Sequence, residues 1–152
     1  MTTTISGLDD LKGLVGQHLG YSDYVEITQD QVNQFADATG DHQWIHVDVE
    51  RATAGPFGGP IAHGFLTLSL APGLLKDVWS VTGAKMGVNY GLNKVRFPSP
   101  VPVGSKVRCG ALLKEVEEVG GGGAQLVLEA TFEAQGSSKP ACVAELVFRY
   151  YF

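Results

Sequence analysis

An aspartate and a histidine stand five positions apart in the segment ATGDHQWIHVD, where Asp41 follows a glycine and His46 comes shortly before a second acid. A carboxylate and an imidazole that face the same water molecule can move protons to and from it, because imidazole titrates near neutral pH. On a continuous α-helix, with about 3.6 residues per turn, side chains five positions apart point about 140° away from each other. Asp41 and His46 can therefore act together only if the chain turns between them.

The same residues also allow a purely structural interpretation. In it, Asp41 caps the next turn of the chain and His46 is a half-buried histidine, since short motifs often match by chance. His42 is expected to point to solvent. His63 is expected to cap a helix or to support a neighbouring residue rather than to react. Asp48 is expected to cap the short helix in DVERAT.

A helix is predicted directly before the pair. Thr28 and Gln31 fit a capping box, and the helix should run from about Gln29 to Ala38. Gly40 can adopt the positive φ of a C-terminal cap, which places Asp41 in the turn after the helix. The apolar face of this helix is Val32, Phe35 and Ala36, and two earlier elements are expected, a helix over Leu8–Val15 and a strand over Tyr21–Ile27.

A second helix, very apolar, is predicted from Gly64 to Trp79, after a loop rich in glycine and proline that ends at Pro60. This helix has no polar face, so it should be buried on every side. Pro72 lacks an amide donor, and its ring clashes with the carbonyl of Leu68, so a kink or a break is expected there.

The rest of the chain alternates apolar and polar residues, as half-buried strands do. Strand patterns run over Met86–Leu92, Val103–Leu113, Leu126–Phe132 and Cys142–Phe148, with a phase shift that indicates a bulge near Asn93. The glycines at 120–123 are expected to form a hairpin loop, because no helix follows them to bind a phosphate. One apolar helix and a long antiparallel meander favour an α+β fold, in which a sheet of about five strands wraps around the buried central helix.

Composition limits the classes of function. The chain has 152 residues, enough for one domain with a sizeable core, and we expect 1–152 to be that single domain. A formal net charge of −5 argues against a nucleic-acid surface. Cys109 and Cys142 fall on strand patterns and are expected to be core residues in a reducing compartment. We expect no signal peptide and no membrane attachment, and hence a cytoplasmic protein, because the most apolar run, Ile61–Leu75, is short and interrupted.

The motif around the pair resembles that of a known family. The segment Thr39–His46, with Ala52 six residues further on, is similar to the signature of MaoC-like, (R)-specific enoyl-CoA hydratases, which runs Gly-Asp-x-Asn-Pro-aliphatic-His, then five residues, then Ala or Ser. The segment NKVRFPSPVPVG (Asn93–Gly104) and the triplet Ala62–Gly64 also resemble that family, so the likeness covers nearly the whole chain.

Two positions depart from that signature. Gln43 replaces the usual Asn and Trp44 the usual Pro, and with Trp44 the sequence looks closer to the nodulation-protein-N-like branch. The Asp/His pair is intact, so these departures bear on the choice of substrate more than on activity.

The resemblance implies a hot-dog fold and the reversible (R)-specific addition of water to a trans-2-enoyl thioester, which gives an (R)-3-hydroxyacyl thioester. It implies that Asp41 and His46 handle the water and that the backbone N–H of Gly64 meets the enolate oxygen. The acyl group would be carried by coenzyme A or an acyl carrier protein, the chain would form a homodimer, and no cofactor or metal is implied. Four basic residues could meet the phosphates of coenzyme A, although a solvated strand face is the simpler interpretation of Lys94, Arg96, Lys106 and Arg108.

Three alternatives stay open beside the enoyl-CoA hydratase. The first is a 3-hydroxyacyl-carrier-protein dehydratase, which runs the same chemistry backwards. The second is a hot-dog acyl-CoA thioesterase, in which a carboxylate activates water against the thioester carbonyl itself. The third is a non-catalytic hot-dog partner subunit, and the intact pair argues against the last two.

Overall fold

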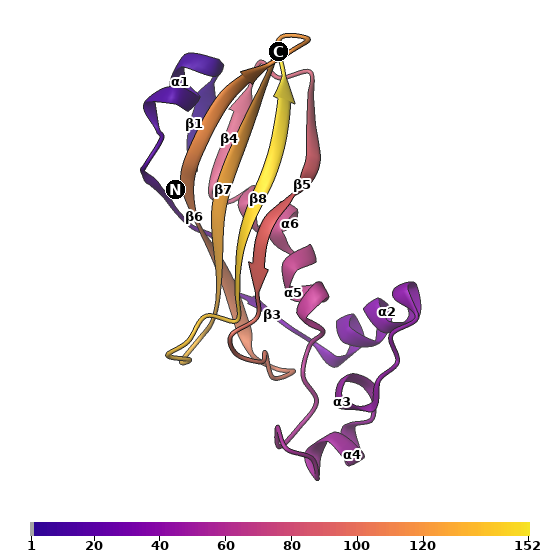
Figure 1. Ribbon diagram of the computed structural model, residues 1–152. Helices are drawn as coiled ribbons and strands as arrows, with labels where there is room; N and C mark the ends of the chain where they lie inside the picture. Colours follow the sequence, from indigo (N-terminus) through magenta and orange to yellow (C-terminus); the bar gives the residue numbers. More distant parts are fainter. Residues whose placement is uncertain (1) are drawn as a thin grey trace.

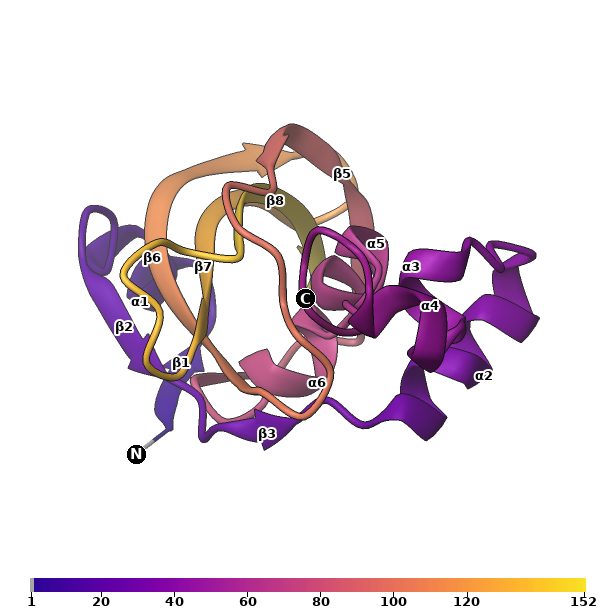
Figure 2. The same cartoon turned by 90° about the horizontal axis from the view of Figure 1, so that it is seen from below.

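A curved antiparallel sheet forms the body of the protein in a computed structural model that describes residues 2–152 (Figure 1). Its strands lie in the order β2-β6-β7-β8-β5, and β3 pairs with the outer side of β6. Their bounds are β2 His18–Tyr21, β3 Val25–Glu26, β5 Met86–Arg96, β6 Lys106–Val119, β7 Gly123–Ala134 and β8 Cys142–Tyr151. The sheet curves around two short helices, α5 (Gly64–Ser69) and α6 (Ala71–Leu75), as Figure 2 shows. The predicted hot-dog arrangement is thereby confirmed.

The alternation of the strands accounts for the core. On β7, Leu126, Leu128 and Phe132 are fully buried, while the polar side chains of Gln125, Glu129, Thr131 and Glu133 are half-buried. Because successive residues of a strand point to opposite faces, one face of the sheet can be apolar and packed on the helices. Cys109 and Cys142 also lie in this core, and burial raises the pKa of their thiols to about 12 and about 11. Neither thiol is a nucleophile near neutral pH.

The break expected near Pro72 is confirmed: the apolar helix is divided into α5 and α6 at Leu70, and Pro72 stands in the first turn of α6, where its missing amide has no bond to lose. The helix differs from its prediction in two other ways. It ends at Leu75 and not at Trp79, which is the first residue of the strand Trp79–Thr82. It is also not buried on every side, because the Phe65 side chain is 69% exposed. A helix at the surface of one chain can present apolar residues to a second subunit. Sequence periodicity alone does not distinguish such residues from residues buried within the chain.

The strand order corrects the prediction of a simple meander. Strands β6, β7 and β8 form consecutive hairpins, but β5 pairs with β8 at the far edge of the sheet and not with β6. The segment between β5 and β6 therefore crosses the open end of the sheet. The register of β5 against β8 shifts between Leu92 and Val95, which confirms the bulge near Asn93. The glycine hairpin is also confirmed, since Gly121 and Gly122 take positive φ between β6 and β7.

The N-terminal part is more divided than expected. Helix α1 (Leu8–Gly13) agrees with its prediction, but the expected strand Tyr21–Ile27 is split into β2 and β3 by residues 22–24. A parallel pair formed by β1 (Thr3–Ser6) and β4 (Trp79–Thr82) was not predicted. Their short sequences carry no periodicity long enough to indicate a partner so far away in the chain.

Three helices project from one end of the sheet: α2 (Gln29–Thr39), α3 (Trp44–Val47) and α4 (Val49–Thr53) (Figure 1). The Thr28 hydroxyl accepts a hydrogen bond from the Gln31 amide at 3.1 Å, which confirms the cap at the start of α2. Gly40 ends the helix with φ 85°. The predicted face is buried at Val32 and Ala36, whereas Phe35 is half-buried.

Candidate active site

The chain turns between Asp41 and His46, as an active pair requires. Gly40 takes a left-handed conformation, and the Asp41 carboxylate accepts a bond from the Gln43 amide at 3.3 Å. Helix α3 then starts at Trp44, which the sequence analysis did not predict. A four-residue helix is too short to show periodicity, so only the capping pattern before it could have indicated one. The turn brings the imidazole of His46 back toward Asp41.

Hydrogen bonds hold both the side chain and the backbone of His46. The Nδ1–H donates to the Ile61 carbonyl at 2.6 Å, so in the neutral ring the lone pair is on Nε2. The backbone carbonyl of His46 accepts from the Gln29 amide side chain at 2.8 Å, which ties α3 to the start of α2. The side chain is 6% exposed. His46 therefore presents one basic nitrogen in a fixed direction.

Asp41, His46 and His63 form one polar cluster. Each offers a carboxylate oxygen or a ring nitrogen, and these atoms lie within 4.8 Å of one another. Burial lowers the pKa of His46, and the charge of His63 lowers it further, while the bond to Ile61 and the charge of Asp41 raise it by less. A nearby carboxylate favours the charged form of an imidazole, but at His46 the effect of burial outweighs that of Asp41. A neutral imidazole with a free nitrogen can serve as a base.

His63 has more contacts in the cluster than the sequence suggested. Its Nε2–H donates to the backbone carbonyl of Asp41 at 3.0 Å, and its ring stacks on that of His46, with centroids 3.9 Å apart and an angle of 24°. Phe35 contacts it as well, at 4.9 Å between centroids. His63 precedes α5 but makes no side-chain cap bond there. Of the two roles expected for it, support of a neighbour agrees with these contacts and helix capping does not.

The cluster fits a metal ion poorly despite its three donors. The lone pair of an imidazole nitrogen lies in the ring plane, so two histidines bind one ion when their planes converge on it. The rings of His46 and His63 lie one above the other at 24°. An ion could be held only after one ring had turned, and we assign no metal to these residues.

A pocket of about 290 Å³ opens beside His46. Gly64, the first residue of α5, lines it together with Thr67 of the same helix, and its other walls come from Phe57, Ile61, Ala62, Phe97–Val101 and Ala141. The three segments that carried the resemblance therefore meet at one place. The Gly64 amide has no acceptor within its own helix, since the first amides of a helix lack one. Because α5 has only six residues, its dipole is weaker than that of the long helix expected.

The contacts of Phe97 and Trp44 were not predicted from the sequence. A Cβ on Gly64 would lie 3.1 Å from the Phe97 ring, so glycine allows this ring to close one side of the pocket. Trp44 packs against Gly55, where a Cβ would lie 3.0 Å from its ring, and Arg51 lies over it at 4.4 Å. Trp44 thus joins α3 to α4 without lining the pocket.

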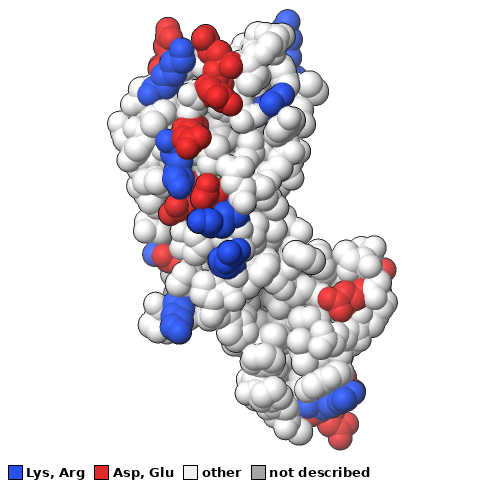
Figure 3. All heavy atoms as spheres, viewed as in Figure 1, with Lys and Arg blue, Asp and Glu red and all other residues white. Residues whose placement is uncertain are grey.

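The remaining polar candidates stay outside the pocket. His42 is exposed and pairs with Asp37 at 3.0 Å, and Asp48 caps α4 by accepting from the Arg51 amide, both as expected. Arg108 pairs with Glu133 at 2.9 Å on the outer face of the sheet. Acidic and basic side chains alternate over that face (Figure 3), so the expected solvated strand face agrees with the structure there.

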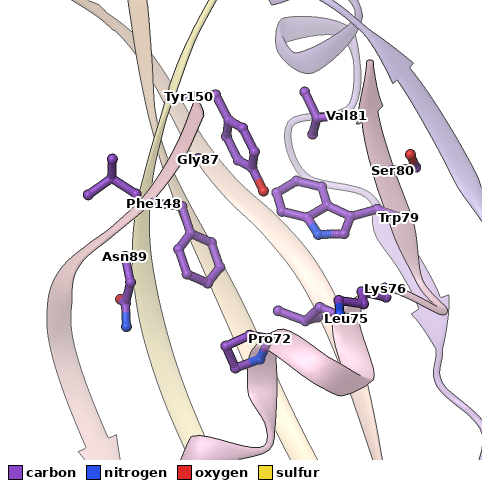
Figure 4. A pocket seen from close by; sticks show the side chains of 11 residues that line it. Pro72, Leu75, Lys76, Trp79, Ser80, Val81, Gly87, Asn89, Phe148 and Tyr150 are labelled. Atoms are coloured by element: carbon purple, nitrogen blue, oxygen red, sulfur yellow. The ribbon is translucent and has the colours of Figure 1, made fainter. Parts of the chain in front are cut away.

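A groove lies along α5 and α6. One part of it is a hollow lined by Leu68, Leu92 and Leu146, which shares Pro72 and Phe148 with a further cavity of about 390 Å³. Figure 4 shows that cavity, where Trp79 of β4 and Tyr150 of β8 meet edge to face at 5.8 Å. The lining is largely apolar, so the groove suits a hydrocarbon chain.

Comparisons with known proteins find one family model and several similar proteins. The family model described as MaoC like domain matches residues 10–131. The chain is 58% identical over 147 residues to the 3-hydroxyacyl-thioester dehydratase Z of Mycobacterium tuberculosis H37Rv, with 97% of each chain covered. It is 43% identical to the nodulation protein N of Rhizobium leguminosarum bv. viciae, with 92% of this chain and 88% of the relative covered.

A solved structure of an (R)-hydratase from A. caviae involved in PHA biosynthesis superimposes with a TM-score of 0.68 at 28% identity. The alignment covers 88% of this chain and 94% of that one. Among residues 2–152, no helix is both long and apolar enough to cross a membrane.

Proposed function

This chain belongs to the MaoC-like domain family and is a hydro-lyase of the hydratase and dehydratase kind, and we propose that it adds water to trans-2-enoyl-CoA to give (R)-3-hydroxyacyl-CoA. The observation that carries the proposal is the meeting of a neutral, buried His46 with the Asp41 carboxylate beside a pocket that Gly64 lines. The relative named as a 3-hydroxyacyl-thioester dehydratase would catalyse the same equilibrium in the other direction.

The proposed steps use three groups of the chain. A water held between Asp41 and His46 loses a proton to Nε2 of His46 while its oxygen bonds to the β carbon of the substrate. The electron pair of the double bond moves toward the thioester oxygen, which accepts a hydrogen bond from the Gly64 amide. The proton on the imidazolium is then available for the α carbon, so the net change is the addition of one water with no other reactant.

The groove supports an acyl chain of medium length. Helices rise by about 1.5 Å per residue, so the stretch from Gly64 to Leu75 is about 17 Å long. An extended hydrocarbon advances about 1.3 Å per carbon, given carbon–carbon bonds of about 1.5 Å, which leaves room for about a dozen carbons. We propose that the acyl chain follows this groove toward Trp79 and Tyr150. Replacement of Leu68 by Trp would then reduce activity on long enoyl-CoAs more than on crotonyl-CoA.

We further propose that two copies of the chain form a homodimer. Strand β5 is the free edge of the sheet, and unpaired edges in native proteins are covered or paired. Apolar side chains are exposed along it and beside the pocket, namely Phe65, Met86, Tyr90, Leu92 and Phe97. Since Phe65 and Phe97 lie edge to face next to Gly64, a second copy would complete the wall of the pocket.

A chain-length series tests the proposal. Crotonyl-CoA and longer enoyl-CoAs are incubated with the protein, loss of the conjugated double bond is followed by absorbance, and the product is analysed on a chiral column. The proposal expects an (R)-3-hydroxyacyl-CoA and no free thiol. Release of coenzyme A without hydration would identify a thioesterase instead, and activity restricted to acyl-carrier-protein substrates would favour the dehydratase alternative.

A further inference from the structure

His63 contacts both members of the candidate pair at once. Its Nε2–H donates to the backbone carbonyl of Asp41, and one face of its ring stacks on the ring of His46. Phe35 of α2 contacts the same ring, and the side chain is 2% exposed. Its Nδ1 is buried without a hydrogen-bond partner among residues 2–152. A buried polar atom without a partner is unfavourable, so a functional reason for this histidine is worth seeking.

We propose that His63 is a positioning residue, which sets both the place of Asp41 and the protonation state of His46. The hydrogen bond to the Asp41 carbonyl holds the turn after Gly40, where no regular helix or strand fixes the backbone. The ring stack prevents the His46 imidazole from turning its Nε2 away from the pocket. This role rests on the proposed function, because it concerns the pair that handles the water.

Electrostatics gives His63 a second effect. The positive charge of a protonated His63 opposes a proton on His46, and this interaction lowers the pKa of His46. Within residues 2–152, two titratable groups face His46: Asp41 from the turn after α2, and His63 from the segment before α5. Gln29 of α2 is polar but does not titrate, and the pocket walls opposite contain no titratable side chain. Removal of His63 should therefore raise the pKa of His46.

The first test uses the unmodified protein and needs no activity. Nitrogen-15 chemical shifts distinguish the two neutral tautomers of each of the four histidines. His63 is expected to carry its proton on Nε2 and His46 on Nδ1, and the titration of His46 should be coupled to the charge of its neighbour. A proton on Nδ1 of His63 would remove the bond to Asp41 and overturn the proposal, even if the protein is an active hydratase.

The second test uses two variants with different losses. In His63→Gln, the amide can still donate near the former Nε2 position, but the ring stack and the charge are lost. In His63→Phe, the ring remains and both the donor and the charge are lost. Both variants should lower kcat about 10- to 100-fold through misplacement of the pair. Because both remove the charge, both should also move the acid limb of kcat/KM and the NMR titration of His46 to higher pH. His42→Gln, which removes an exposed histidine beside Asp41, is the matched control and should change neither.

A purely structural role predicts a different pattern. Both variants would then melt at lower temperature and turn over more slowly, while the titration of His46 stayed where it is in the unmodified protein, and that result would overturn the proposal. If neither variant folds, the tautomer of His63 in the unmodified protein still decides. If the protein has no hydratase activity at all, the proposed function fails, whereas the tautomers and coupled titrations still test the contacts of His63.

Discussion

At the scale of single residues, Asp41 and His46 differ in exposure, and in the proposed mechanism this difference divides their work. Asp41 is exposed at the tip of a turn, where its side chain can orient water. His46 is buried, held through Nδ1 and free at Nε2. Neither residue completes the chemistry alone, because water must be both held and deprotonated.

The first prediction follows from that division. Asp41→Asn and His46→Ala should each lower hydratase kcat by about 100-fold or more, while the circular dichroism spectrum is unchanged. Since the two residues act on the same water, the double variant should be little slower than the slower single variant. Near wild-type turnover in either single variant, with an intact fold, would remove that residue from the mechanism.

The second prediction concerns pH and uses the lowered pKa of His46. The acid limb of kcat/KM should lie below pH 6.5, the ordinary pKa of histidine, because His46 stays neutral to lower pH. The same shift acts on stability: between the folded and unfolded pKa values the unfolded chain binds more protons. This contribution is complete above pH 6.5 and is lost as pH falls through the folded pKa.

Urea titrations at pH 5.5 and 7.5 measure the effect on stability. The free energy of unfolding should fall less between these two values in His46→Gln than in the unmodified protein, since glutamine does not titrate. An equal fall in both proteins would mean that His46 does not resist protonation in the folded state.

At the scale of elements, the start of α5 sets the space for the thioester in the proposed mechanism. Gly64→Val should lower turnover by about 100-fold, the loss typical of a misplacement of about 1 Å at a reacting group. Gly64→Ala is milder but not silent, because its Cβ would lie 3.1 Å from the Phe97 ring, which must give way slightly. Hydration rate and melting temperature are measured together for both variants. Full activity in a folded Gly64→Val would reduce Gly64 to a packing residue.

The cap of α2 offers an element-scale prediction about stability. Thr28→Ala removes the acceptor of the Gln31 amide and should reduce the free energy of unfolding by about 1 kcal/mol. Thr28→Ser keeps the hydroxyl and is the matched control. Chemical denaturation measures both, and an alanine variant as stable as the serine variant would show that the cap contributes nothing measurable.

Elements with a local cause were predictable from the sequence. Helix α2 was predicted to within a residue at its end, because Thr28 and Gly40 mark its two ends chemically. The approach of Asp41 and His46 to each other was also predicted, since Gly40 indicates the turn that brings the two side chains together. The interaction of His63 with both was not found, because it depends on contacts between segments whose approach no local pattern encodes.

At the scale of the whole molecule, the same limit applies to the sheet. Alternation predicted which residues form strands, but it could not reveal that β5 lies beside β8, or that Phe65 is exposed. Both facts concern the free edge of the sheet. Both are explained if a second copy of the chain covers that edge. Apolar residues covered by a second copy and apolar residues of an ordinary core give the same pattern in the sequence of one chain.

The assembly prediction follows from this edge. Light scattering at micromolar concentration should give the mass of a dimer, and Leu92→Arg on β5 should shift it toward the monomer with loss of activity. Val15→Arg is the matched control, because Val15 is similarly exposed, at 44% against 46% for Leu92, and lies outside β5. A stable and fully active monomer would refute the proposed homodimer.

The most direct measurement of the central claim follows the oxygen of water. The protein is incubated with an enoyl-CoA in water enriched in oxygen-18, and the products are analysed by mass spectrometry. The Asp41/His46 mechanism predicts one labelled oxygen on carbon 3 of an intact 3-hydroxyacyl-CoA, and formation of this product about 100-fold or more slower with Asp41→Asn. Label in a free carboxylate, with release of coenzyme A and no hydroxyl on carbon 3, would contradict it.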